Sequence, residues 1–195
     1  MELSGVIVGR RTEGRLRRTL AAAEAAELSY DHPGSTLREG SIPGVADRWF
    51  ALEVRGELAV AAAALRRWVP HSGIRARIHP TNAAIEVGAT LLVVAPFGPF
   101  EMAVPDRIVA VVDEPTRFGF AYGTLAGHAE AGEELFLAEQ VAQSRLRLTV
   151  RVHARPATLS ARLGAPLVTL LQRVAARRYL NAWAAEIEGW PEPAS

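Results

Sequence analysis

Apolar and polar residues alternate most regularly over residues 145–155. The even-numbered positions from Leu146 to Ala154 are apolar, and Arg, Thr or His occupies the odd-numbered ones. A period of two is that of a β-strand, so this segment predicts a strand in a sheet with one buried and one polar face. Short apolar stretches punctuated by Pro or Gly predict further consecutive antiparallel strands. They lie at about residues 74–79, 86–96, 100–112, 116–125 and 133–141.

Two segments before these strands carry apolar residues at helical spacing. Residues 12–28 predict one helix, and five Arg residues make this end of the chain locally basic. Residues 45–68 predict a second helix, because their apolar residues recur mostly four apart. That series begins with Phe50, Val54, Leu58 and Ala62.

After Pro156 the apolar period becomes helical again. Residues 157–188 predict a short turn followed by a long amphipathic C-terminal helix. Gly164 and Pro166 separate the two, with Pro166 near the start of the helix. The expected order is therefore helix, helix, a run of antiparallel strands and a terminal helix. A sheet of this kind must bury one face, and the terminal helix can cover it. We therefore predict a single α+β domain over residues 1–195, in which a curved sheet packs on the C-terminal helix and encloses a cavity. Residues 1–30 would be its N-terminal basic segment and helix.

The densest polar segment is FGFAYGTLAGHAEAGEELF, from Phe118 to Phe136. On its first predicted strand, glycines alternate with large side chains, and such glycine-rich faces mark close approach of a backbone. Gly127 and Gly132 flank the connection to the next strand. The segment can therefore be a hairpin with glycine-dependent turns only, or the polar part of a ligand site. The side chains that share the other strand face are Phe118, Phe120, Tyr122 and Thr124.

Glu133 and Glu134 are adjacent, so on a strand their side chains point to opposite faces. The pKa of the one that faces a cavity would be raised by burial, and that group could act as an acid or a base. His128 and Tyr122 are its candidate partners. Arg155, where the last strand ends, is expected to pair with one of the two carboxylates.

Composition narrows the classes of activity. The chain has no Cys, so thiol catalysis, Cys-ligated metals and disulfides are excluded. All 22 basic residues are Arg, which excludes a lysine Schiff base. A net charge of +1 argues against nucleic acid as a partner. No signal peptide, membrane span, nucleotide motif or metal-ligand spacing is recognisable, so we expect a cytoplasmic protein without cofactor or metal.

The segment from Phe118 to Phe136, with its YGTL-x-GH-x-x-x-GEE-x-F run, resembles the signature of the bacterial and plant family known as domain of unknown function 1990. The resemblance extends in order over residues 28–181, through Tyr30-Asp31, ALRRW at Ala64, RPAT at Arg155 and QRVAARRYL at Gln172. That family is similar in fold to the START and birch-pollen-allergen superfamily of helix-grip domains. The resemblance implies a cavity for an apolar small molecule and carries no activity with it.

Three functions follow as hypotheses. The first is a protein that holds a lipid-like or other apolar ligand between sheet and C-terminal helix. The second is a cyclase- or hydrolase-type enzyme that uses an inward Glu with His128 or Tyr122. The third is an interaction protein with an Arg-rich surface, formed by the N-terminal helix and Arg145, Arg147 and Arg151. The ligand-binding residues expected under the first are Phe118, Phe120, Tyr122, Thr124, His128, Glu133, Glu134, Phe136 and Arg155, with Leu148, Val150, Leu167 and Leu171 as further apolar liners.

Overall fold

The computed structural model describes residues 2–3, 6–9, 12–126, 128, 130–157 and 165–189. The helices are α1 (Glu13–Glu24), η1, a 3₁₀ turn (Ser35–Leu37), α2 (Leu58–Arg66), α3 (Val69–Ser72) and α5 (Ala165–Glu188). The strands are β1 (Glu2–Leu3), β2 (Val6–Gly9), β3 (Ala46–Arg55), β4 (Arg77–His79), β5 (Thr90–Phe97), β6 (Phe100–Glu114), β7 (Arg117–Thr124), β8 (Glu130–Ala142) and β9 (Arg145–Pro156).

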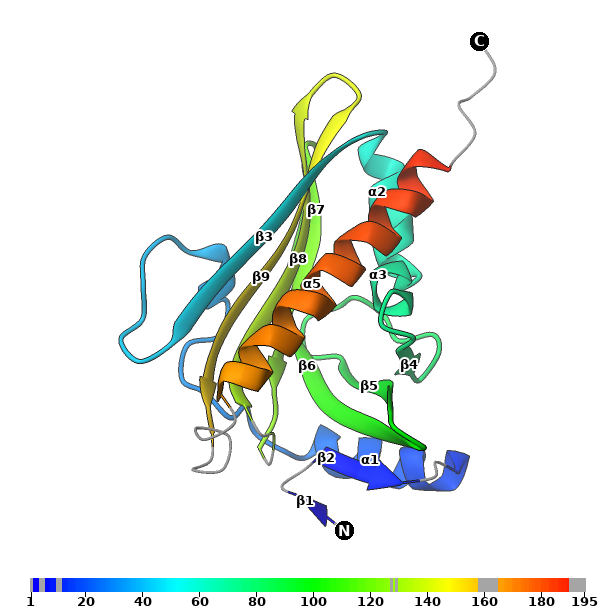
Figure 1. The fold of residues 1–195 in the computed structure, drawn as a ribbon, viewed down its shortest axis with the longest axis vertical. Coiled ribbons are helices and arrows are strands. Elements are labelled where there is room, and N and C mark those ends of the chain that lie inside the picture. The colour runs from blue at the N-terminus through cyan, green and yellow to red at the C-terminus, as the bar shows by residue number, and fades with distance from the viewer. Residues whose placement is uncertain are drawn as a thin grey trace.

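The described strands form one antiparallel sheet. Its main path runs β1-β2-β6-β7-β8-β9-β3, and β5 pairs with β6 and with β4. The sheet bends around α5, which crosses its concave side, while α2 and α3 lie beside α5 on that same side (Figure 1). The α+β helix-grip architecture expected from the sequence is therefore confirmed.

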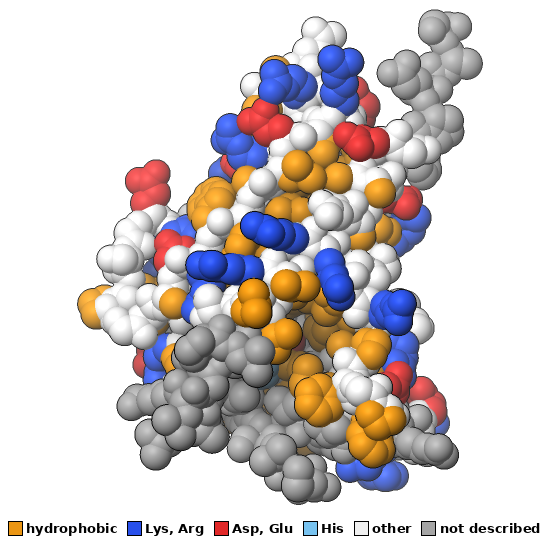
Figure 2. Space-filling view, viewed as in Figure 1, with side chains coloured by type: hydrophobic (Ala, Val, Ile, Leu, Met, Phe, Trp, Pro, Cys, Tyr) orange, Lys and Arg blue, Asp and Glu red, His pale blue; other side chains and the backbone are white. Residues whose placement is uncertain are grey.

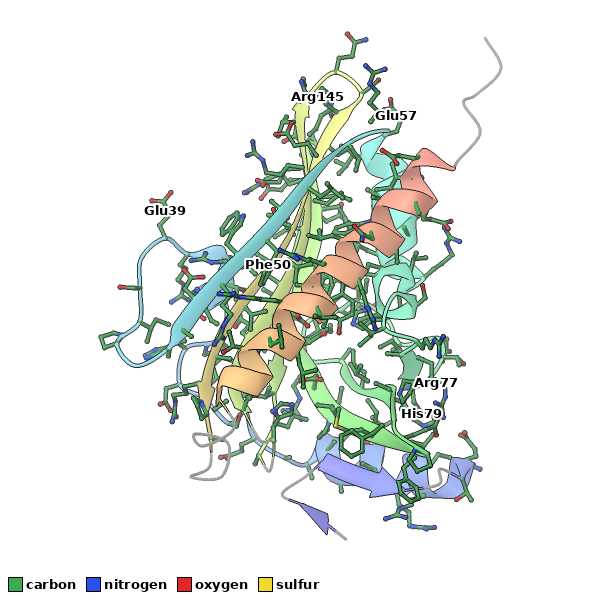
Figure 3. All side chains as sticks on the ribbon, viewed as in Figure 1. Glu39, Phe50, Glu57, Arg77, His79 and Arg145 are labelled. Atoms are coloured by element: carbon green, nitrogen blue, oxygen red, sulfur yellow. The ribbon has the colours of Figure 1, made fainter. Side chains whose placement is uncertain are left out.

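The main core fills the space between the concave side of the sheet and the helices. Trp183 of α5 is fully buried, and its indole nitrogen donates a hydrogen bond to the carbonyl of Ala61 in α2 at 3.1 Å. Phe120 and Phe136, on β7 and β8, stack with their ring centres 5.4 Å apart. Phe50 packs against this core from β3 (Figure 3). Tyr179 of α5 packs edge-on against Phe136, with ring centres 5.2 Å apart, so aromatic packing holds α5 against the sheet.

The helix predicted for residues 45–68 is wrong in its first half. Residues 46–55 form β3, whose side chains alternate between half-buried and exposed, and only residues 58–66 are helical. Residues four apart lie on one face of a helix and also on one face of a strand, so the Phe50–Val54 spacing could not separate the two. Gly56, at φ 154°, turns the chain from β3 toward α2, where a Cβ would lie 2.2 Å from Ile187. The observed order is therefore two short strands, a helix, a 3₁₀ turn, a strand, two helices, six strands and a helix among the described residues.

The second face of β9 is polar, as expected, but only partly exposed. The segment around η1 covers its far end, where Thr149, Arg151 and His153 are buried. The Arg151 guanidinium donates to the Asp47 carboxylate at 3.0 and 2.8 Å, and to the carbonyls of Thr36 and Arg38 at 2.9 Å each. The sheet is thus sandwiched at this end.

The two terminal helices agree with the sequence in kind. The first is shorter than expected, as α1 ends at Glu24. The second is α5; the turn expected at Gly164 lies outside the described residues, as do residues 190–195. None of the described helices combines the length and apolar character that a membrane span requires.

Candidate functional site

A cavity of about 310 Å³ lies between the sheet and the N-terminal half of α5. Figure 2 shows the surface hollowed beside α5, with apolar side chains gathered around the hollow. Leu171 on α5 borders the cavity and is 58% exposed, so the cavity opens to solvent near that helix. Its apolar walls are formed by Ile74, Val93, Ala95, Met102, Val104, Val152, Ala154, Leu171 and Ala175.

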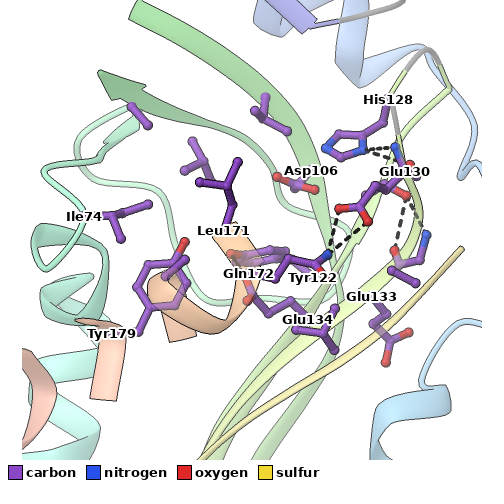
Figure 4. Close-up of a pocket in the computed structure, with 18 of the residues that line it drawn as sticks. Ile74, Asp106, Tyr122, His128, Glu130, Glu133, Glu134, Leu171, Gln172 and Tyr179 are labelled. Atoms are coloured by element: carbon purple, nitrogen blue, oxygen red, sulfur yellow. Dashed lines mark hydrogen bonds between the residues drawn. The ribbon is translucent and has the colours of Figure 1, made fainter. Parts of the chain in front are cut away.

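The polar end of the cavity is built by three neighbouring strands. Asp106 of β6 lies opposite Thr124 of β7, and Tyr122, two residues earlier on β7, lies opposite Glu134 of β8. Because side chains alternate along strands, this register places all four on the concave face. Figure 4 shows Asp106, Tyr122 and Glu134 around one part of the cavity.

Glu134 is the inward-facing member of the glutamate pair. The Tyr122 hydroxyl donates a hydrogen bond to its carboxylate at 2.5 Å. Burial raises the pKa of Glu134 to about 7, against the opposing effect of that hydrogen bond. The Glu134 carboxyl group is therefore poised to gain or lose a proton near neutral pH.

Asp106 is more deeply enclosed. It is 3% exposed, borders the cavity, and makes no side-chain hydrogen bond to the described part of the chain. Burial, and then the charge of Glu134, raise the pKa of Asp106 well above its usual value. A buried carboxyl group without a partner is rare, because its charge is costly to desolvate.

A third carboxyl group, that of Glu130, lies at the end of β8. It accepts hydrogen bonds from the Gln172 amide of α5 at 3.0 and 2.8 Å. Burial raises the pKa of Glu130, and the nearby charge of Arg48 opposes that rise. The His128 ring nitrogen Nδ1 lies 2.8 Å from the Glu130 carbonyl oxygen and 2.9 Å from the Glu130 amide nitrogen, so hydrogen bonding to this backbone fixes the imidazole at the rim (Figure 4).

The Glu133 carboxylate lies on the opposite face of the sheet. Its carboxylate accepts hydrogen bonds from the Tyr30 hydroxyl at 3.0 Å, from the Gly34 amide at 2.7 Å and from the Thr36 amide at 3.0 Å, and the Thr36 hydroxyl donates a further one. The expected pairing of Arg155 with Glu133 or Glu134 is not found among the described residues: these donors surround the Glu133 carboxylate, and Tyr122 is the donor to Glu134. Glu133 therefore ties the segment around η1 to the sheet.

Behind Tyr122 lies a buried imidazole. His71 of α3 is 1% exposed, and its Nε2 lies 3.3 Å from the Tyr122 hydroxyl oxygen. Tyr122 donates to Glu134, so its oxygen accepts from His71, which makes His71 the Nε2–H tautomer. Burial lowers the pKa of His71 to about 3. His71, Tyr122 and Glu134 thus form one hydrogen-bonded row that ends in the cavity.

The structure brings together part of the predicted site. Tyr122, Thr124, His128, Glu134 and Leu171 line the cavity. Glu133 borders it but directs its carboxylate away. Arg155 borders a second cavity of about 190 Å³ on the other face of the sheet, beside Tyr30 and His153. The side chain of Leu167 lies outside the described residues. The predicted liners found in the packed core instead are Phe118, Phe120, Phe136, Leu148 and Val150.

Sequence reasoning missed Asp106, Glu130, Gln172 and Tyr179. For Asp106 a signal exists, because it alternates with Val104 and Ile108 on an otherwise apolar strand face. Tyr179 is visible in the sequence only as a member of the apolar helix stripe. Nothing local marks Glu130 or Gln172, which meet through tertiary packing.

Fold and cavity together define a helix-grip protein with an acid-lined internal site. Residues 50–182 match the family described as "Domain of unknown function (DUF1990)", and the chain belongs to that family. Over 100 residues it is 40% identical to a UPF0548 protein of Deinococcus radiodurans, a match that covers 47% of this chain and 50% of the relative. The chain thus spans about half the length of that curated relative.

Solved structures with this fold are distant in sequence. A hypothetical protein from Helicobacter pylori superposes with a TM-score of 0.58 at 14% identity, over 75% of this chain and 91% of that one. A conserved protein from Geobacillus kaustophilus superposes with a TM-score of 0.53 at 10% identity, over 74% of this chain and 96% of that one. Norcoclaurine synthase from Thalictrum flavum, in complex with dopamine and hydroxybenzaldehyde, gives 0.50 at 12% identity, over 80% and 97%. At such identities the likeness shows the fold alone.

Proposed function

We propose that this protein binds a compact, largely apolar small molecule between its sheet and α5. The observation that carries this proposal is the cavity of about 310 Å³, which has apolar walls and polar groups converging at one end. Ligand sites in proteins commonly combine these features, starting from about 300 Å³. The polar groups would orient the ligand, and the apolar walls would supply most of its binding free energy.

The test is native beside denaturing mass spectrometry of protein purified from its own cells, with organic extraction of whatever is released. We expect a stoichiometric adduct on the native protein. An Ala175→Trp variant, which fills the cavity from α5, should lose that adduct. Ala185→Trp, on the exposed side of the same helix, is the matched control and should keep it. An adduct that survives in a folded Ala175→Trp variant would place the ligand elsewhere and refute the proposal.

A second candidate function, acid–base catalysis, is favoured by one specific contact. The Tyr122 hydroxyl oxygen lies 2.5 Å from a carboxylate oxygen of Glu134 at the cavity, and burial raises the pKa of Glu134 to about 7. Such a pair can take a proton from a bound water or substrate and return it. Hydrolysis of 4-nitrophenyl butyrate would test this, with a rate that rises through about pH 7 and falls at least about tenfold in Glu134→Gln. A rate unchanged in that variant would exclude this role for Glu134.

A further inference from the structure

The cavity holds an unusual set of charges. Three carboxyl groups border it, from Asp106, Glu130 and Glu134, and no described lining residue is an Arg. Of the three, Glu130 is affected by the charge of Arg48, whose guanidinium donates a hydrogen bond to the Thr169 hydroxyl at 3.0 Å. Asp106 and Glu134 have no cation among the described residues that acts on them. The part of the polar end around Asp106 and Glu134 is therefore acidic, and no cation among the described residues offsets these two groups.

The Asp106 carboxyl group lacks a hydrogen-bond donor, and this indicates what the ligand must supply. Glu130 has Gln172 and Glu134 has Tyr122, but the Asp106 side chain has no hydrogen-bond donor in the described part of the chain. It is nonetheless 3% exposed and directed into the cavity (Figure 4). A buried acceptor that faces a cavity without a protein partner is suited to a donor from a ligand.

The chemistry of the walls limits what that ligand can be. A fatty acid or phosphate ester needs a cation to offset its negative charge, and no described lining residue is an Arg. A metal ion is not supported either, because no three acidic or imidazole groups of the described residues are close enough to coordinate one. Beyond the acids the walls are aliphatic and aromatic, as at Val104, Leu171 and Tyr179.

We propose that the cavity selects a primary or secondary amine on a compact apolar body, with its ammonium group between the carboxylates of Asp106 and Glu134. This inference rests on the proposed binding function and names its ligand class. An ammonium group has several donors and no acceptor, so it can satisfy the unpartnered Asp106 and the free lone pairs of Glu134 together. Charge-assisted hydrogen bonds of this kind are about twice as strong as neutral ones.

The protonation of the empty site is consistent with such a ligand. Burial raises the pKa of both Asp106 and Glu134; the charge of Glu134 adds to the rise at Asp106, and the charge of Glu130 adds to the rise at Glu134. Each shift reflects the free energy required to hold a carboxylate there without a cation. A bound ammonium would lower that cost and favour the ionised forms.

The test uses three probes of nearly the same shape: 2-phenylethylamine, 2-phenylethanol and phenylacetate. Their affinities for the full chain at pH 7.5 can be measured by NMR titration. We expect the amine to bind at least about tenfold more tightly than the alcohol, and phenylacetate to bind most weakly. Alcohol binding equal to or tighter than amine binding would overturn the amine inference and leave the proposed cavity function in place. Failure of all three at millimolar concentration would count against the cavity function itself.

Variants assign the effect to the site. Asp106→Asn should weaken amine binding about tenfold and leave alcohol binding within about threefold. Asp113→Asn, on the same strand but exposed beside Arg66, is the matched control and should change neither. Glu134→Gln provides a second variant should Asp106→Asn fold poorly. Equal loss of amine and alcohol binding in a folded variant would mean that the carboxylate does not distinguish the charged ligand from the neutral one, and would overturn the inference.

Discussion

Glu133 and Glu134 are consecutive in the chain, yet their carboxyl groups lie on opposite faces of β8 and do different work. Glu133 collects donors from Tyr30, Gly34 and Thr36 and holds the η1 segment on the outer face. Glu134 faces the cavity and shares a short hydrogen bond with Tyr122. One is an anchor of the fold, and the other belongs to the candidate site. The two can therefore be tested separately.

Glu134→Gln should change the pH dependence of stability. The folded-state pKa of Glu134 is raised from about 4.5 to about 7. A raised pKa stabilises the folded protein below about pH 4.5, and that contribution is lost as pH rises toward 7. The variant lacks this loss, so its free energy of unfolding should gain on the wild type by about 3 kcal/mol between these pH values. Urea denaturation from pH 4 to 8 measures the difference, with Glu139→Gln on the same strand as the control.

His71 should remain neutral at pH 5. Burial lowers its pKa from 6.5 to about 3, so protonation in the folded state is suppressed. A lowered pKa of a base means that its contribution to stability is complete above pH 6.5 and declines as pH falls toward 3. This trend is opposite to that of Glu134 over the shared range. NMR of the imidazole nitrogens is the direct measurement, and a titration midpoint near 6.5 would contradict the buried arrangement.

Glu133→Gln should destabilise the protein by about 2–4 kcal/mol. An amide offers one acceptor oxygen and would direct its NH₂ group at donors that now bind the second carboxylate oxygen. Tyr30→Phe removes a single hydrogen bond and should cost about 1 kcal/mol. Denaturant unfolding of both variants measures the two values. Similar small effects of the two substitutions would show that Glu133 is not the anchor described here.

Gly123→Ala should destabilise the protein through Tyr30. A Cβ at Gly123 would lie 2.1 Å from the Tyr30 hydroxyl oxygen, so the ring must move away from Glu133. We expect a loss of about 1–3 kcal/mol, largely relieved in a Tyr30→Ala background. Gly119→Ala is the control, because its Cβ would meet the backbone carbonyl of Phe136 at 2.3 Å. Unfolding free energies of the two glycine variants, of Tyr30→Ala and of the two double variants decide it; equal relief for both glycines would refute the specific contact.

The sequence predicted the strand order from residue 77 onward because each strand has its own turn residues and apolar stretch. It failed at β3, where a spacing of four fits either structure. Within the site, Tyr122 and the Glu133–Glu134 pair could be predicted from the sequence, because alternation along a strand assigns neighbouring side chains to opposite faces. Which of the two glutamates faces the cavity depends on the register of β8 against β7, which the sequence does not give. The partnership of Glu130 with Gln172 joins β8 to α5 across 42 residues. Such a contact is set by helix placement, which local patterns do not encode.

The paired arrangement of Glu133 and Glu134 also bears on how the sheet assembles. A slip of β8 by one residue would move each glutamate to the face of the other. Glu133 would then lack the donors of the η1 segment, and Glu134 would lose the Tyr122 hydroxyl. A misaligned sheet therefore forfeits both sets of hydrogen bonds at once, and the correctly aligned one gains them together. The two neighbouring carboxylates thus favour, during folding, the strand alignment on which the cavity depends.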